Sequence, residues 1–202
     1  MIEITDINLK ETIARLQAVP DKDTWKTTTT RIFKLNIAQF LCRKPKKKIV
    51  ELGAAQGHTS YFISPLASKV LAIDYDQKNC DLIKDLKCDN VDVLQEDLYS
   101  SEFTAYMKNQ QFDVAIIDAV HVYDNVKKDI SNAKLAGVKD FIFDDYGAFP
   151  DVKRAVDEFI NDEIKNNRKV TSFVIGMPPG SNYPNTSFQI LKDWEGIIVS
   201  ID

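Results

Sequence analysis

Apolar residues recur along the chain in two alternating patterns. Short runs that are apolar almost throughout predict strands buried on both faces, while stretches with an apolar residue every three or four positions predict helices. The predicted strands are residues 49–52, 69–74, 91–95, 112–118, 139–145, 170–176 and 188–201. The predicted helices are one from Arg31 with Phe33, Ile37, Phe40 and Leu41 on one face, then 58–67, 79–86, one carrying Val122, Val126, Ile130 and Ala133, and one that opens at Pro150.

Strands that alternate with helices predict right-handed crossovers and a mostly parallel sheet with helices on both faces. The last strands have no helix between them, which predicts an antiparallel edge. We therefore expect an α/β fold, a doubly wound, mostly parallel, seven-stranded sheet with an antiparallel edge. Residues 31–202 would form this single domain, and the weakly periodic residues 1–30 a cap or a lid. Ligands bind such sheets at the carboxyl ends of the strands.

Composition limits the function. The 202 residues carry a net charge of −4 and 44% are hydrophobic, which fits a globular domain and disfavours a dedicated nucleic-acid binder. The three cysteines form no CxxC pair, so neither a disulfide framework nor a zinc ribbon is expected. Without a signal-peptide layout or a long apolar run, a cytoplasmic protein with no membrane attachment is expected. The basic run 43–48 is typical of a solvated turn, and contact with RNA phosphate stays open.

Two of the chain's seven glycines fall directly after the first predicted strand, in the sequence GAAQG at 53–57. Glycine permits a positive φ and close approach of a ligand to the backbone, and the next helix presents free N–H groups. A dinucleotide fingerprint requires G-x-G-x-x-G and a P-loop requires GxxxxGK[ST]. The spacing G-x-x-x-G therefore suits a ligand without a bridging pyrophosphate and disfavours a nicotinamide-dependent oxidoreductase. A plain tight turn is the alternative.

Carboxylates that could bind a nucleoside lie at the ends of the second and third predicted strands. Asp74 ends the second strand, where a carboxylate can accept two hydrogen bonds from a ribose diol. Capping of the next helix is the alternative role, and Asp76 is the better candidate for it. Asp97, after the third strand, is a candidate acceptor for an adenine amino group.

Three carboxylates follow the fourth and fifth predicted strands. Asp118 ends the fourth strand, and Asp144 and Asp145 end the fifth. Like charges that converge in one cleft raise each other's pKa, and a hard cation such as Mg²⁺, which takes oxygen ligands, would relieve this. A cap on the next segment is the alternative. His121 is a candidate general base near neutral pH, with a surface or capping histidine as the alternative.

Together these features resemble a class I S-adenosylmethionine-dependent methyltransferase, over roughly residues 30–175. VELGAAQGHTS is similar to the first motif of that superfamily, Asp74 to its ribose-binding acid, and FDVAIIDA to its fourth motif. IIDAVHVYDN and FIFDDYGAFPDVKRAVDEF resemble the small-molecule O-methyltransferase branch, which is family-24-like and includes macrolide-sugar and catechol-type enzymes. The resemblance implies a Rossmann-like fold and methyl transfer to a hydroxyl of a small molecule or sugar.

The resemblance also implies roles for residues. Glu51, Gly53 and Gly57 would line the methionine end of the cofactor, Asp74 the ribose and Asp97 the adenine. The implied cofactor-binding residues are Glu51, Gly53, Ala54, Gly57, Thr59, Ser60, Asp74, Tyr75, Asp97 and Asp118, and the implied metal ligands are Asp118, Asp144 and Asp145. Mg²⁺ would lower the pKa of the acceptor hydroxyl, and Asp118 or His121 would take its proton.

Departures from the family pattern affect the substrate class most. The Pro-Gly-Gly that usually precedes the fifth strand is replaced by residues 135–139, and the N-terminal portion is short for the sugar-modifying members. The loop 177–185 is a candidate substrate lid, with Trp25 and the threonine run 27–30 on the other side of the cleft, and exposed connections are the alternative. RNA or protein methylation, a non-catalytic module and a homodimer stay open.

Overall fold

The computed structural model describes residues 7–21, 29–43, 47–184 and 186–202. Within these residues, seven strands form one sheet in the order β3-β2-β1-β4-β5-β7-β6. The strands are β1 (Lys47–Leu52), β2 (Ala67–Asp74), β3 (Val91–Gln95), β4 (Val114–Ile117), β5 (Asp140–Phe143), β6 (Val170–Ile175) and β7 (Gly196–Ile201). Strands β1 to β5 pair in parallel, while β7 runs antiparallel to both β5 and β6. The predicted Rossmann-like α/β fold is confirmed.

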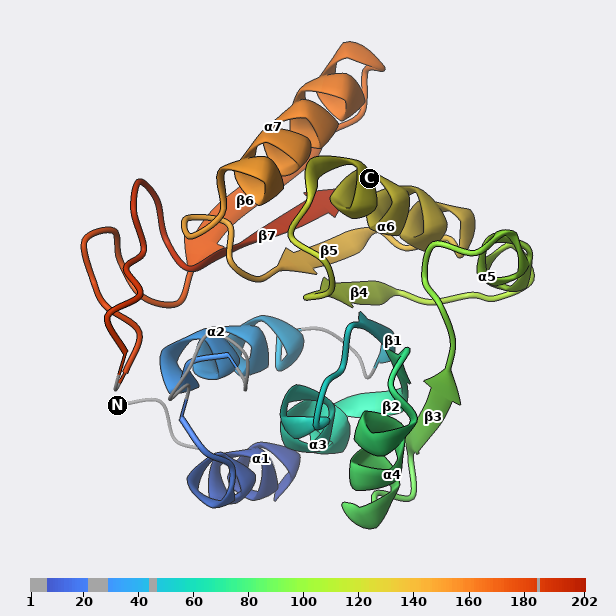
Figure 1. Ribbon diagram of the computed structural model, residues 1–202, viewed down its shortest axis with the longest axis vertical. Helices are drawn as coiled ribbons and strands as arrows, with labels where there is room; N and C mark the ends of the chain where they lie inside the picture. Colours follow the sequence, from blue (N-terminus) through green and yellow to red (C-terminus); the bar gives the residue numbers. More distant parts are fainter. Residues whose placement is uncertain (1–6, 22–28, 44–46, 185) are drawn as a thin grey trace.

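Helices cover both faces of the sheet (Figure 1). One face carries α5 (Ser101–Met107), α6 (Tyr123–Leu135) and α7 (Pro150–Lys165), and the other carries α1 (Ile7–Ala18), α2 (Arg31–Leu41), α3 (His58–Ile63) and α4 (Gln77–Asp85). In the described parts of the chain, no helix combines the length and the apolar character that crossing a bilayer requires.

Alternation along the strands decides which face each side chain meets. Val50 and Leu52 belong to the core under α5, α6 and α7, whereas Ile49 belongs to the core under α1, α2 and α3. Glu51 therefore points toward α2 and α3. The same parity directs Asp118, which continues from Ile116, toward that face.

The predicted helix 58–67 is too long. Helix α3 ends at Ile63, and Ser64–Leu66 form a 3₁₀ turn before β2 begins at Ala67. Pro65 lies in this turn and has no N–H to donate to the next helical hydrogen bond, which explains the early end.

The last predicted strand, 188–201, begins later than expected, at Gly196. The segment before it bonds to another loop instead of the sheet, since the Tyr183 N–H donates to the Phe188 carbonyl and the Ile190 N–H to the Ser181 carbonyl. Helix α5 was not predicted, because its two buried side chains, Phe103 and Met107, are too few to show a helical period.

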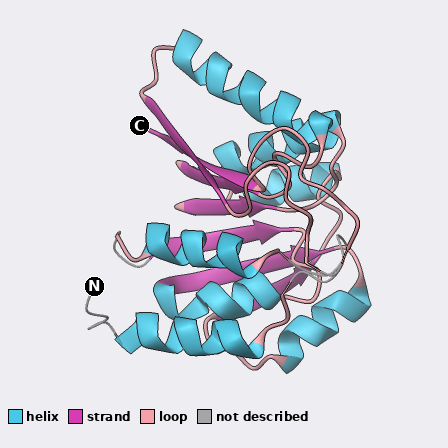
Figure 2. Cartoon of the chain, turned by 90° about the vertical axis from the view of Figure 1, so that its left-hand side faces the viewer, coloured by secondary structure: helices cyan, strands magenta, loops and turns pink. Residues whose placement is uncertain are grey.

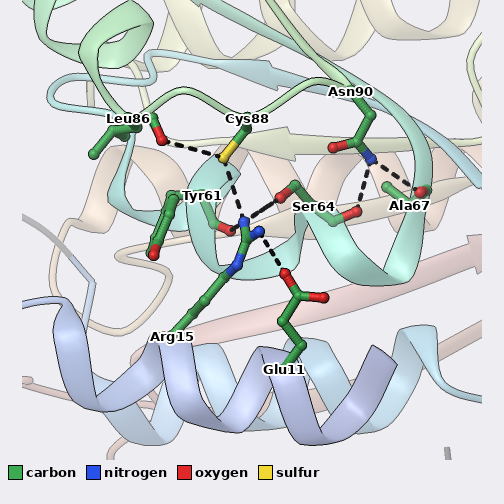
Figure 3. Close-up of polar contacts among 8 residues, drawn as sticks. All are labelled: Glu11, Arg15, Tyr61, Ser64, Ala67, Leu86, Cys88 and Asn90. Carbon is green, nitrogen blue, oxygen red and sulfur yellow. Dashed lines mark hydrogen bonds and ion pairs between the residues drawn. The ribbon is translucent and has the colours of Figure 1, made fainter. Parts of the chain in front are cut away.

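Helix α1, which falls within the predicted cap or lid segment, contacts α3 and the 3₁₀ turn through Arg15 (Figure 3). The Arg15 Nη1 donates to the Tyr61 carbonyl at 2.8 Å, to Ser64 Oγ at 2.6 Å and to Cys88 Sγ at 3.3 Å. Its guanidinium also lies 4.5 Å from the centre of the Tyr61 ring. This residue fixes α1 to the helix that follows the glycine turn.

The basic run leads directly into β1. Residues 44–46 of the run lie outside the described ones. Lys47 Nζ lies 3.7 Å from Asp113 Oδ1, and the Lys48 N–H donates to Asp113 Oδ2 at 2.8 Å. Lys47 and Lys48 therefore both contact Asp113, the residue directly before β4.

Candidate active site

The loops that follow the parallel strands gather at one edge of the sheet (Figure 2). In the turn after β1, Gly53 and Gly57 have φ values of +86° and +75°, which strain a residue with a Cβ. A Cβ on Gly53 would lie 2.4 Å from the Asp118 carbonyl oxygen and 2.6 Å from Ala119 Cα. Glycine at position 53 therefore lets the turn after β1 touch the loop after β4.

Asp74, the predicted ribose ligand, ends β2 and is 6% exposed. Its Oδ2 accepts from the Ala55 N–H at 2.8 Å, and its Oδ1 accepts from the Asp76 N–H at 2.9 Å and from Asn79 Nδ2 at 3.1 Å. The side chain of Asp76 caps α4, as the sequence indicated, so Asp74 is left to face the glycine turn. The adjacent Tyr75 is exposed.

Glu51 lies buried next to the first turn of α3. The Ser60 hydroxyl donates to its carboxylate. Burial raises the pKa of Glu51 to about 8, against the opposing effects of the Ser60 hydrogen bond and the Lys34 charge. The side chain can therefore exchange a proton near neutral pH.

Lys34 was not predicted as part of the site, yet it is fully buried on α2. Its Nζ donates to the Thr29 carbonyl at 2.6 Å and to Thr29 Oγ1 at 2.7 Å. Burial lowers the pKa of Lys34 to about 8, while four acidic side chains act in the opposite direction. These are Asp144, Glu195, Glu51 and Asp118. The buried Lys34 ammonium group therefore interacts electrostatically with acids from four separate segments of the chain.

Glu195 was also missed, because it falls within residues predicted as a strand. Its Oε1 accepts from the Thr30 N–H at 3.0 Å, and its Oε2 accepts from Thr30 Oγ1 at 2.5 Å and from the Met177 N–H at 3.0 Å. A Cβ on Gly176 would lie 2.5 Å from Glu195 Oε2. The buried Glu195 carboxylate therefore joins the start of α2 to the loop after β6.

Asp118, His121 and Asp145 converge after β4 and β5, with their ligand atoms within 4.8 Å of one another. His121 Nε2 lies 3.6 Å from Asp118 Oδ1 and 3.4 Å from Asp145 Oδ2. Asp145 has a φ of +56°, and the Tyr183 hydroxyl donates to its Oδ1. We call these three residues the acid–histidine cluster.

Asp144, the third predicted metal ligand, has different surroundings. Among the described residues it is not a member of the acid–histidine cluster. Its carboxylate is buried, and of the four acids it has the largest effect on Lys34. Burial, together with the charges of Asp144 and Asp145, raises the pKa of Tyr183, so the phenol stays a hydrogen-bond donor.

Aromatic rings line one side of the acid–histidine cluster. The His121 ring stacks on Phe149 with 4.4 Å between centroids, Phe149 lies 5.6 Å from Phe188, and Phe188 stacks on Tyr183 at 5.8 Å. Tyr183 comes from the loop 177–185, so the predicted lid contributes a side chain to the site. We call Phe149, Phe188 and Tyr183 the aromatic wall.

Asp97 and the threonine run 27–30 were also predicted to lie near the cofactor or the cleft. Asp97 is exposed in the loop after β3, and its Oδ1 accepts from the Tyr99 N–H at 3.0 Å. Trp25 and the first two threonines of the run lie outside the described residues. Thr29 Oγ1 lies 3.5 Å from Thr59 Oγ1, which places the end of the run beside α3.

The arrangement offers two kinds of chemistry at one sheet edge. The glycine turn has the carboxyl groups of Glu51 and Asp74 beside it, and such groups can accept hydrogen bonds from the hydroxyl or ammonium groups of a ligand. The acid–histidine cluster can bind a cation or accept a proton. The contact between Gly53 and the Asp118 backbone makes the two groups neighbours.

A family model described as a methyltransferase domain matches residues 50–139, which include the glycine turn, Asp74, Asp118 and His121. No curated protein matches the sequence.

Solved structures share the fold at low sequence identity. The O-methyltransferase from Bacillus cereus in complex with SAH is 18% identical, with a TM-score of 0.60, covering 100% of this chain and 93% of that one. Precorrin-6y C5,15-methyltransferase from Geobacter metallireducens GS-15 is 14% identical, with a TM-score of 0.61 and coverage of 92% and 96%. An rRNA methylase from Streptococcus thermophilus is 15% identical, with a TM-score of 0.52 and coverage of 83% and 93%.

Proposed function

We propose that this chain is a class I S-adenosylmethionine-dependent methyltransferase that moves the methyl group of its cofactor to a hydroxyl group of a small molecule, with a divalent cation at the acceptor end. The observation that carries the proposal is the contact between Gly53 and the Asp118 backbone. A cofactor bound along the glycine turn would have its reactive end beside the acid–histidine cluster, where an acceptor hydroxyl can lose its proton.

The cofactor would be held by charge and by hydrogen bonds from this chain. Glu51 would accept from the methionine ammonium group, whose positive charge would favour the carboxylate form of this buried acid, and the Asp74 carboxylate would accept from the ribose hydroxyls. Asp74 is preorganised for this, because Ala55, Asp76 and Asn79 already fix its orientation.

Asp74→Asn is expected to weaken the binding of S-adenosylhomocysteine (SAH) by about 10- to 100-fold, since an amide cannot accept both ribose hydrogen bonds as a carboxylate does. Isothermal titration calorimetry measures the affinity directly. Asp76→Asn is the matched control, because asparagine caps a helix as well as aspartate does. An unchanged affinity in Asp74→Asn would remove Asp74 from the ribose.

The donor atoms of the acid–histidine cluster fit a divalent cation. Carboxylate oxygens from Asp118 and Asp145 suit Mg²⁺ or Mn²⁺, which prefer oxygen ligands, and His121 would then have the separate role of accepting a proton. The Tyr183 hydroxyl orients Asp145 by donating to its Oδ1, whereas the Oδ2 of Asp145 is the oxygen that lies near His121. A bound cation would act as a Lewis acid toward the acceptor hydroxyl.

The remaining work belongs to the chain's own residues. Phe149 and Phe188 of the aromatic wall give an apolar surface for the acceptor, which must bring its oxygen to about 3 Å from the methyl carbon and in line with the bond to sulfur. As the oxygen–carbon bond forms and the sulfur–carbon bond breaks, His121 Nε2 takes the hydroxyl proton. The negative charges of Asp118 and Asp145, whose oxygens lie 3.6 Å and 3.4 Å from this nitrogen, would favour the imidazolium that results.

Asp118→Ala is expected to abolish transfer and to weaken Mn²⁺ binding at least tenfold, while the affinity for SAH changes by no more than about twofold. Mn²⁺ binding is measured by electron paramagnetic resonance, SAH binding by calorimetry, and transfer with labelled cofactor on a panel of hydroxylated small molecules. Asp124→Ala, at an exposed position in the first turn of α6, is the control. Equal loss of SAH and Mn²⁺ binding would mean that Asp118 is structural.

A further inference from the structure

Asp129 on α6 is a buried acid outside the site described above. It is fully buried, as is Asn132 one turn further on. Among the described residues, the Oδ1 atoms of both side chains lack a hydrogen-bond partner. Burying such groups costs free energy, so their presence needs a reason.

The buried position of Asp129 affects the charge of its carboxyl group. Burial raises its pKa far above the usual range, against the weaker effects of the Tyr99 hydrogen bond and the His121 charge. The protonated form is therefore favoured more than in an exposed aspartate, and this form has an O–H donor in addition to its acceptor oxygen.

Both side chains hold the loop that follows β3. The Tyr99 hydroxyl donates to Asp129 Oδ2 at 3.4 Å, and Asn132 Nδ2 donates to the Leu98 carbonyl at 3.1 Å. The Tyr99 hydroxyl also accepts from the Val120 N–H at 3.3 Å. Burial raises the pKa of this phenol too, so it remains protonated and able to donate.

These hydrogen bonds connect the loop after β3, which carries Asp97, to the loop after β4, which carries Asp118 and His121. Tyr99 lies two residues after Asp97 and donates its own N–H to that side chain. Val120 lies between Asp118 and His121 in the acid–histidine cluster. The Tyr99 phenol is therefore a direct link between the loop after β3 and the loop after β4.

We propose that Tyr99 is a positioning residue whose hydroxyl, supported by Asp129, couples the nucleoside end of the cofactor site to the acceptor end. The proposal rests on the proposed function for what each loop binds. When the cofactor fixes residues 96–100, the phenol holds the Val120 backbone, and with it the loop that carries Asp118 and His121.

Hydrogen-exchange mass spectrometry of the full chain, with and without SAH, tests this. In the wild type, SAH slows exchange in peptides covering 96–100 and 118–122. In Tyr99→Phe, residues 118–122 exchange about fivefold faster without SAH, as expected for one lost hydrogen bond, and SAH slows their exchange less than in the wild type, while 96–100 respond as before. Asp129→Asn, which keeps an acceptor oxygen and a donor, behaves like the wild type, and Asp129→Leu behaves like Tyr99→Phe.

Tyr106→Phe is the matched control. Tyr106 is a half-buried tyrosine on α5 whose hydroxyl makes no hydrogen bond within the described residues. Unchanged exchange at 118–122 in Tyr99→Phe, or an equal rise in Tyr106→Phe, overturns the proposal. If SAH does not protect the wild type, the proposed cofactor role fails and the coupling fails with it. Faster exchange in SAH-free Tyr99→Phe would then leave the hydrogen bond with a structural role only.

Discussion

Gly53→Ala is expected to abolish detectable SAH binding and to lower the free energy of unfolding by about 3 kcal/mol. Part of the loss is the left-handed backbone at φ +86°, which costs a residue with a Cβ about 1–2 kcal/mol. The rest is overlap, since the new Cβ would lie 2.4 Å from the Asp118 carbonyl oxygen. A backbone atom cannot rotate away as a side chain can, so the turn and the loop after β4 must separate.

Gly137→Ala is the matched control for this prediction. Gly137 has a similar φ of +77°, but a Cβ there would meet no atom within 4 Å. It is expected to cost only the backbone strain, about 1–2 kcal/mol, and to leave SAH binding unchanged. Urea unfolding and calorimetry provide the two readouts. Wild-type SAH affinity in Gly53→Ala would contradict the assignment of the turn to the cofactor.

Lys34→Met is expected to destabilise the fold by about 3 kcal/mol and to weaken SAH binding, because it leaves buried acids without their counter-charge. Methionine fills a similar volume, so little of the effect would come from packing. The acids that lose this charge are Glu51, Asp118, Asp144 and Glu195. Lys127→Met, which removes a lysine paired with Glu158 at the surface, is the control and should leave the urea midpoint unchanged.

The pH dependence separates Lys34 from a merely structural residue. Folding lowers the pKa of Lys34 from its ordinary value of 10.5 to about 8. Between pH 8 and 10.5 the unfolded chain therefore binds more protons than the folded chain. Stability contributed by this group therefore rises with pH across that window. Glu51 acts in the opposite sense, since its raised pKa makes stability fall as pH rises from 4.5 to about 8. In Lys34→Met the rise above pH 8 should be absent, and its persistence would exclude Lys34 as the cause.

Most of the fold could be predicted because its strands are buried on both faces. β1 to β5 appear in the sequence as apolar runs separated by helical patterns, and parallel pairing follows from that alternation. The segment 188–195 could not be assigned, since its backbone bonds to the loop at 180–183 and no local pattern encodes that partner. Apolar content alone made these residues look like a strand.

Some residues of the candidate site could likewise be predicted from the sequence and others could not. Asp74 ends β2, Asp118 directly follows β4 and Asp145 lies two residues after β5, so the shared carboxyl edge of a parallel sheet predicts that they lie at one edge. Lys34 and Glu195 escaped notice because charged residues are normally solvated, and only the tertiary fold shows them buried. A signal for Lys34 did exist. It shares the buried stripe of α2 with Ala38 and Leu41, so a lysine stands where the helix pattern calls for an apolar residue.

The order of the strands has a consequence for how the chain is made. β7 comes after β6 in the chain, yet it lies between β5 and β6 in the sheet. As the chain leaves the ribosome, β6 emerges with no partner strand and must wait for Gly196–Ile201 before it can join. A chain that stopped within β7 would therefore leave β6 without a partner strand. The exposed edge of this partly apolar strand could then pair with other nascent chains.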